Sequence, residues 1–168
     1  MVLVFKKLGC LYNLNMTEFF LKKSLPFVEN IFYGERLLAI ILRSDFKKNG
    51  IEFFTPNDFS QQLGYMKRDE GYEIPPHVHN PVKRSVEYTK EVLFIKSGKV
   101  RVDFYSEDKE YLRSLILSKG DIILLAFGGH GFKMLNEAEI VEIKQGPYAG
   151  DSDKTRFKAI SESEVRYK

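Results

Sequence analysis

The three histidines of this 168-residue chain are the side chains whose spacing points most directly to chemistry. His77 and His79 stand two residues apart, directly after Pro75 and Pro76, which favour extended backbone. In an extended chain such residues point to the same face about 7 Å apart, within reach of one metal ion. His130 follows two glycines, where a bulge can turn a side chain inward.

Short strands are the elements that must position these side chains. Runs rich in Ile, Leu, Val, Phe and Tyr are separated by turn signals such as Asn49-Gly50 and Ser97-Gly98. Only Thr17 to Leu25 is typical of a helix, because Thr17 is a suitable N-cap and a proline follows. The expected strands are Arg36 to Arg43, Ile51 to Phe54, Phe59 to Lys67, Glu91 to Lys96, Lys99 to Tyr105, Leu112 to Leu117, Asp121 to Leu125, Gly131 to Leu135 and Glu139 to Lys144.

The close spacing of these short strands along the chain predicts an all-β fold, an antiparallel sandwich or barrel, because parallel strands would need long crossovers. A chain of 168 residues is long enough for one sizeable core. It has no run of 18 apolar residues, so we expect no membrane-spanning helix. Met1 to Leu14 lacks the pattern of a signal peptide, and we therefore expect a cytoplasmic protein.

Composition excludes several classes of function. The 26 basic and 23 acidic residues are mixed along the chain, unlike the clustered basic surface of a nucleic-acid-binding protein. The single cysteine, Cys10, rules out an internal disulfide framework and a cysteine-based metal cluster. The sequence has no Gly-rich phosphate loop and no Gly-x-Ser-x-Gly elbow. We expect neither a nucleic-acid nor a membrane partner.

The histidines and their surroundings resemble the cupin family of double-stranded β-helix (jelly-roll) barrels. The first cupin motif consists of Gly, five residues, His-x-His, a spacer, Glu, six residues and Gly. The residues that match it are Gly71, His77, His79, Glu91 and Gly98, and the second motif resembles Gly120 through His130. The resemblance covers Arg36 to Pro147. It implies a cupin barrel with one divalent transition metal, Fe, Mn, Ni, Cu or Zn, held by His77, His79, Glu91 and His130.

Departures from the cupin pattern concern the ligands and the pocket wall. The spacer from His79 to Glu91 holds eleven residues where the family has three or four, so we expect an inserted loop between them. Glu87 is the alternative carboxylate ligand. Ala126 and Met134 stand where the family has Pro and Asn, which alters the wall beside the metal. The alternative for the histidines is that they are ordinary surface or core residues.

A wider resemblance is to single-domain bacterial cupins, often associated with synthesis of cell-surface polysaccharide. It rests on Ile51 to Pro56, Phe59 to Met66, Phe127 to Phe132, and Lys144 to Tyr148 with Asp153-Lys154. It implies a sugar or sugar-derived ligand. Alternation along the strands places Glu91, Leu93 and Ile95 on one inward face, and His130, Phe132 and Met134 on another. The other pocket candidates are polar residues near the motifs: Gln61, Tyr65, Tyr72, Lys133, Lys144 and Tyr148.

Three functions are compatible with these residues. The first is a metal-dependent cupin acting on a small carbohydrate-derived molecule. The second is a non-catalytic module that binds or senses a sugar or an acid. The third is a metal-free sugar isomerase in which a histidine is the general base. Because a fold does not fix a function, sequence alone does not separate an enzyme from a binding protein.

The expected organisation has three parts. Residues 1–35 form an N-terminal segment packed on the barrel, residues 36–148 form the cupin barrel, and residues 149–168 form a polar tail. The N-terminal segment carries seven aromatic residues, whose apolar surface must be covered. We therefore predict a homodimer with this segment partly in the interface.

Overall fold

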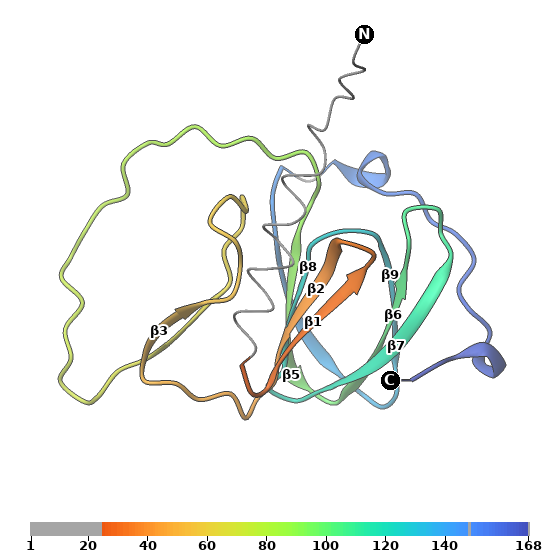
Figure 1. The fold of residues 1–168 in the computed structure, drawn as a ribbon, viewed down its shortest axis with the longest axis horizontal. Helices are drawn as coiled ribbons and strands as arrows, with labels where there is room; N and C mark the ends of the chain where they lie inside the picture. Colours follow the sequence, from red (N-terminus) through yellow and green to blue (C-terminus); the bar gives the residue numbers. More distant parts are fainter. Residues whose placement is uncertain (1–24, 148, 168) are drawn as a thin grey trace, which may run out of the picture.

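The computed structural model describes residues 25–147 and 149–167, and nearly all of its regular structure is β (Figure 1). All pairings between its strands are antiparallel, which confirms the all-β prediction. No helix in this part of the chain is long and apolar enough to cross a membrane. The strands are β1 (Val28–Tyr33), β2 (Arg36–Leu42), β3 (Gly50–Phe53), β4 (Gly64–Lys67), β5 (Glu91–Ser97), β6 (Lys99–Tyr105), β7 (Tyr111–Ser118), β8 (Ile122–Leu125), β9 (Gly129–Met134) and β10 (Glu139–Lys144).

Two sheets form the body of the protein. One has five strands in the order β1-β2-β8-β5-β10, and the other has three in the order β7-β6-β9. Strands β3 and β4 pair separately as a two-stranded sheet. Within the described residues β9 and β10 are each the edge of their sheet, so the sheets do not join into a closed barrel.

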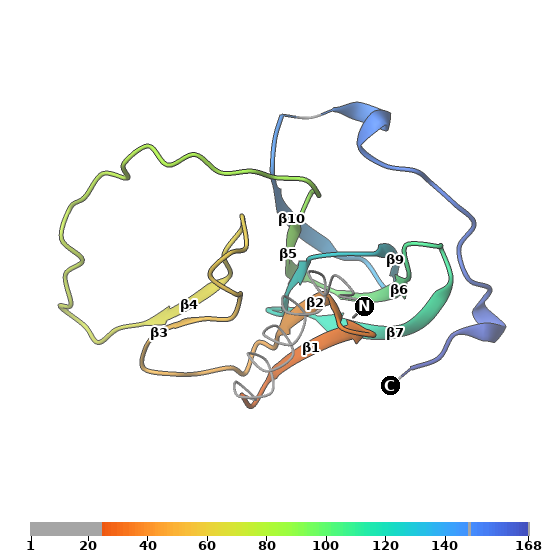
Figure 2. The same cartoon turned by 45° about the horizontal axis from the view of Figure 1, so that its top comes forward.

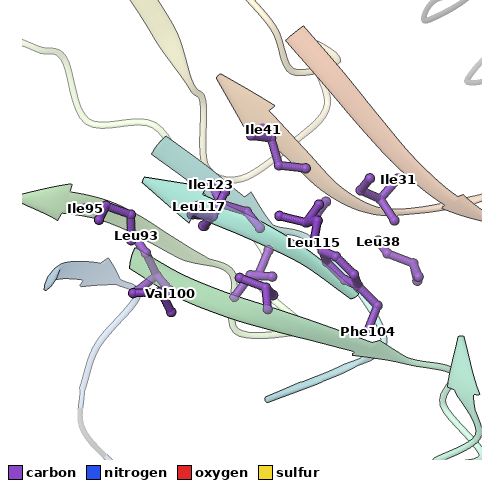
Figure 3. Packing of buried hydrophobic residues seen from close by; sticks show 13 residues of the cluster. Ile31, Leu38, Ile41, Leu93, Ile95, Val100, Phe104, Leu115, Leu117 and Ile123 are labelled. Atoms are coloured by element: carbon purple, nitrogen blue, oxygen red, sulfur yellow. The ribbon is translucent and has the colours of Figure 1, made fainter. Parts of the chain in front are cut away.

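The main core lies between the two sheets, as Figure 3 shows. Alternate residues of β6 supply one side, and Val100, Val102 and Phe104 are at most 1% exposed. Leu93 and Ile95 on β5 supply the other. The register pairs His130, Phe132 and Met134 with Phe104, Val102 and Val100, so these three share the inner face, as alternation predicts.

A second apolar cluster covers the part of the outer face of the five-stranded sheet that β2 and β8 form. Ile40 and Leu42 of β2 pack there with Phe46, Phe54 and Leu63 from the connection between β2 and β4. Strand β2 is thus buried on both faces, which explains why Leu37 to Leu42 shows no polar alternation.

Most strand ends lie within two residues of the sequence prediction, and two differences are larger. Residues 59–63 are not a strand, because Gln62 instead donates side-chain hydrogen bonds to the carbonyls of Pro56 and Phe59 and accepts one from Thr55. Strand β1 was not predicted; it lies in the expected N-terminal segment and pairs with β2. The expected helix, Thr17 to Leu25, falls almost wholly outside the described residues.

Two long segments have little regular structure. Residues 68–90, which we call the arm, connect β4 to β5, and most of this segment stands away from both sheets in Figures 1 and 2, whereas its end at Tyr88 to Lys90 contacts the body. Residues 149–167, which we call the strap, contain two short 3-10 turns, Gly150–Asp153 and Glu162–Glu164. The strap crosses the outer face of the three-stranded sheet, and its Tyr167 forms a bridge with Ser114 of β7.

Candidate functional site

Glu91 and His130 come together at one end of the space between the sheets. Glu91 is the first residue of β5, and His130 lies near the start of β9. The His130 Nε2 atom lies 3.1 Å from the Glu91 Oε2 atom. Gly128, two residues before His130, has a φ of +73°, and a Cβ there would lie 2.7 Å from the Tyr105 carbonyl oxygen, so this turn requires glycine. The structure thus unites two of the four predicted ligands.

Lys144 adds a positive charge beside this pair. It stands directly opposite Glu91 on β10, and its Nζ atom lies 3.6 Å from Glu91 Oε1. The same Nζ atom lies 2.8 Å from Glu142 Oε1. The hydrogen bond to Glu142, together with the charges of Glu142 and Glu91, raises the pKa of Lys144. Lys144 therefore stays protonated near neutral pH, and its single charge offsets part of the negative charge of the two carboxylates.

The environment of Glu91 keeps it ionised. The hydrogen bond from His130 lowers the pKa of Glu91 below its usual value, although partial burial opposes this effect. The charges of His130, Lys144 and Lys154 lower it further. Glu91 is therefore a carboxylate at neutral pH, able to accept a hydrogen bond or to ligate a cation.

A cavity of about 650 Å³ opens beside Glu91 and His130. Two aromatic pairs lie in its wall: Tyr88 packs on Phe127 with ring centroids 5.4 Å apart, and Tyr105 packs on Phe157 at 5.0 Å. Phe132 also lines the cavity, with its ring centroid 5.3 Å from that of His130. The strap closes one side with residues from Asp153 to Phe157 and with Ala159.

His77 and His79 lie on the exposed arm, apart from this cavity. Their ring centroids are 5.2 Å apart, and His77 Nδ1 lies 3.0 Å from the Pro75 carbonyl oxygen. Among the residues that the structure describes, no three His, Cys, Asp or Glu side chains gather as a metal site would require. Glu87 is also on the exposed arm, so Glu91 is the carboxylate next to His130.

The other predicted pocket residues are dispersed. Tyr65 packs on Phe46 in the outer cluster, and Tyr72 stacks under the Arg68 guanidinium on the arm. Lys133 pairs with Glu162 of the strap at 2.7 Å, because it points to the outer face. Gln61 accepts a hydrogen bond from Gln145, Met134 is 46% exposed on the inner face, and Tyr148 lies outside the described residues.

Sequence reasoning missed the strap as part of the site. Lys154, Arg156 and Phe157 line the cavity, whereas residues 149–168 were expected to be a polar tail, of which only Asp153-Lys154 entered the wider resemblance. One available signal was Phe157, an aromatic residue in an otherwise polar stretch, and it packs on Tyr105. Tyr88 and Phe127 were likewise not singled out for the pocket.

Comparison of the chain with protein-family models, with curated proteins and with solved structures gives no match. The functional inference therefore depends on the residues that line the cavity.

Proposed function

We propose that this chain is a jelly-roll protein of the cupin type that binds a small carbohydrate-derived molecule beside Glu91 and His130. The observation that carries the proposal is the contact of a carboxylate with an imidazole, 3.1 Å apart, in the wall of a cavity of about 650 Å³. Cavities of this size take small molecules, and convergent titratable groups with a shifted pKa are typical of functional sites.

The lining of the cavity suits a sugar derivative. The rings of Tyr88, Phe127, Tyr105 and Phe157 offer apolar surfaces for the C–H face of a sugar. Carboxylates accept hydrogen bonds from hydroxyl groups, and cationic side chains donate to them. A cavity with both kinds of group favours a ligand that is polar at its edges and apolar on its face.

We further propose that His77, His79, Glu91 and His130 hold one divalent transition metal here. Imidazole and ionised carboxylate are suitable ligands for Zn, Fe, Mn, Ni or Cu, and Glu91 and His130 already lie side by side. The contact of His77 Nδ1 with the Pro75 carbonyl leaves Nε2 available, as is common for metal-binding histidines. The bound ion would supply a Lewis acid or bind oxygen.

The sequence pattern of the arm supports its closure onto the cavity. Its apolar residues, Tyr72, Ile74, Val78, Val82, Val86 and Tyr88, all occupy even positions, whereas both histidines occupy odd ones. This alternation is typical of a β-strand. Strand β9 is an edge strand beside the cavity, and edge strands present backbone groups that can pair with another strand. Pairing of the arm with β9 would bring the two histidines toward Glu91 and His130.

A metal-free sugar isomerase is the second candidate, and the Glu91–His130 contact favours it specifically. A carboxylate that is hydrogen-bonded to one imidazole nitrogen fixes the orientation and the tautomer of the ring. Catalytic carboxylate–histidine pairs use this arrangement to make the histidine a general base. In this candidate Glu91 orients His130, and the other nitrogen of His130 removes a proton from the sugar. The arm histidines have no part in it.

Elemental analysis of protein purified without added metal separates the two candidates. The metal site predicts about one divalent ion per chain, and loss of most of it in His77→Ala and His130→Ala. Both variants should also melt at a lower temperature, because the ion binds only the native state. Glu91→Ala should lose more metal than the control Glu87→Ala. Full occupancy in both histidine variants would contradict the metal site.

The ligand class is tested by thermal shift against sugar acids and nucleotide sugars. At a concentration of one hundred times Kd, a ligand of the native state stabilises it by about 2.7 kcal/mol. We expect such a shift in the wild type and a smaller one in His130→Gln. A shift that survives metal removal but is lost in His130→Gln supports the isomerase. A wild type that responds to no member of the panel contradicts the carbohydrate proposal.

A further inference from the structure

The strap is held in a defined position over the cavity. Thr89 Oγ1 donates a hydrogen bond to Asp153 Oδ1 at 3.0 Å, and the Ile160 amide donates to the Tyr105 hydroxyl at 3.0 Å. Between these two attachments Phe157 packs edge-on against Tyr105. The strap residues that line the cavity, 153–157 and 159, therefore lie in a segment that is held at both ends.

Beyond the cavity, a buried polar network anchors the strap to the sheet. Arg101 is 3% exposed and makes two hydrogen bonds to Asp103, at 2.8 and 3.0 Å. It also donates to both carboxylate oxygens of Glu162, at 3.0 and 2.9 Å. The Arg101–Asp103 pair is bidentate and fixes the orientation of the guanidinium, whose Nη1 atom makes both contacts with Glu162. The strap is thus a preorganised wall of the site.

The carboxylates of the cavity already have partners. Glu91 contacts His130 and Lys144, and Glu142 contacts Lys144. Asp153 accepts the hydrogen bond from Thr89. Each of these carboxylates therefore already has a polar partner within the protein.

The two cationic side chains with which the strap lines the cavity have few ion-pair partners. Lys154 lines the cavity without an ion-pair partner among the described residues. Arg156 pairs at 2.6 Å only with Asp151, and both of these side chains are more than 70% exposed. Lys154 has extended backbone (φ −153°, ψ 148°), and residues two apart in an extended segment lie on one side. Two cations are thus available to one ligand group.

We propose that Lys154 and Arg156 bind a phosphate group of the ligand, so that the site takes a phosphorylated sugar derivative. The inference rests on the proposed function of the cavity and names its substrate class. A doubly charged phosphate matches two cations, and Arg binds phosphate oxygens in a two-pronged geometry. Glu91 and His130 then face the sugar part, while the strap holds the phosphate.

Isothermal titration with three probes tests the proposal: a hexose 1-phosphate, the same hexose without phosphate, and inorganic phosphate. We expect the wild type to bind the hexose phosphate at least about tenfold more tightly than the neutral hexose. The double variant Lys154→Ala/Arg156→Ala should lose about 10- to 100-fold in affinity for the hexose phosphate, as expected for removal of charged hydrogen bonds. Lys158→Ala removes an equally exposed strap charge outside the cavity lining and should bind as the wild type does.

The outcomes separate this inference from the proposed function. Equal affinity of the wild type for both hexoses, or unchanged binding in the double variant, overturns the phosphate site. Binding of inorganic phosphate that the double variant loses supports it even if the neutral hexose does not bind. Neutral hexose binding that is insensitive to His130→Gln counts against the proposed function alone. Absence of binding by all three probes overturns both. Far-UV circular dichroism checks that each variant remains folded.

Discussion

At the scale of single residues, strand alternation predicts which side chains of β5 and β9 face inward, and Glu91 and His130 are two of them. Alternation places Glu91 on the same face as Leu93 and Ile95, and the structure buries both of these in the core. Within residues 68–90 the same alternation does not fix which strand the arm pairs with, because three prolines there, Pro75, Pro76 and Pro81, lack the amide hydrogen that strand pairing uses. Alternation therefore turns Glu91 and His130 inward, where the structure places them 3.1 Å apart, and leaves the position of the arm histidines open.

Gly98 is a residue that the backbone itself requires. Its φ is +81°, and a Cβ there would lie 2.2 Å from the carbonyl oxygen of Glu137. We predict that Gly98→Ala lowers the free energy of unfolding by about 1–3 kcal/mol or more, because strain and a backbone clash combine. Urea denaturation measures this loss.

Gly34→Ala is the matched control for Gly98→Ala. Gly34 also has a positive φ, +58°, but nothing lies within 4 Å of the added Cβ. It should therefore show only the conformational cost, about 1 kcal/mol. Equal losses in the two variants would show that the contact with Glu137 has no effect.

At the scale of elements, apolar pattern predicted most strands, and contacts with other elements decided the exceptions. The run from Leu37 to Leu42 was recognisable as a buried strand from its composition alone. Residues 59–63 were also predicted as part of a strand, but side-chain hydrogen bonds from Gln62 take the place of strand pairing there. The strap was not recognisable, because its attachment depends on Arg101 and Tyr105, which lie more than fifty positions earlier in the chain. Such distant partners leave no local pattern in the sequence.

Attachment of the strap should depend on pH. Hydrogen bonds from Lys133 and Arg101 lower the pKa of Glu162 below its usual value. A carboxylate whose pKa is lowered by docking favours the docked state above its ordinary pKa, about 4.3, and loses this contribution as the pH falls below it. We predict that the amide NMR signals of Ile160 and Glu164 move toward those of a detached strap as the pH falls below about 4.3.

Glu162→Gln provides the comparison for this titration. The amide cannot ionise, so in this variant the same signals should report a weaker attachment that does not change over this pH range. A wild-type titration indistinguishable from that of the variant would show that Glu162 does not hold the strap.

At the scale of the whole molecule, the outer face of β5 and β10 exposes apolar side chains. Phe94 is directly opposite Val141, and Ile143 follows on the same face; the three are 37%, 46% and 55% exposed. Apolar groups of this kind mark association surfaces. We predict a homodimer in light scattering of the full chain, as the aromatic N-terminal segment also indicates. Ile143→Lys should shift the dimer toward monomer, whereas Ile116→Lys, on an exposed site of β7, should leave it unchanged.

The contribution of the N-terminal segment is tested separately. A truncation beginning at Leu25 keeps β1, which pairs with β2. Weaker dimerisation of this truncation would place the segment in the interface. A full chain that is monomeric, or a truncation that dimerises as strongly as the full chain, would contradict that prediction.

The proposed metal site requires that the arm and the cavity form one site, and the three histidines make this directly measurable. Long-range ¹H–¹⁵N spectra report each imidazole separately while Zn²⁺ is added as a diamagnetic probe. We predict that the signals of His77, His79 and His130 change together and saturate at about one equivalent of Zn²⁺ per chain. Changes at His77 and His79 that leave His130 unaffected would contradict it, because the metal would then be bound by the arm alone.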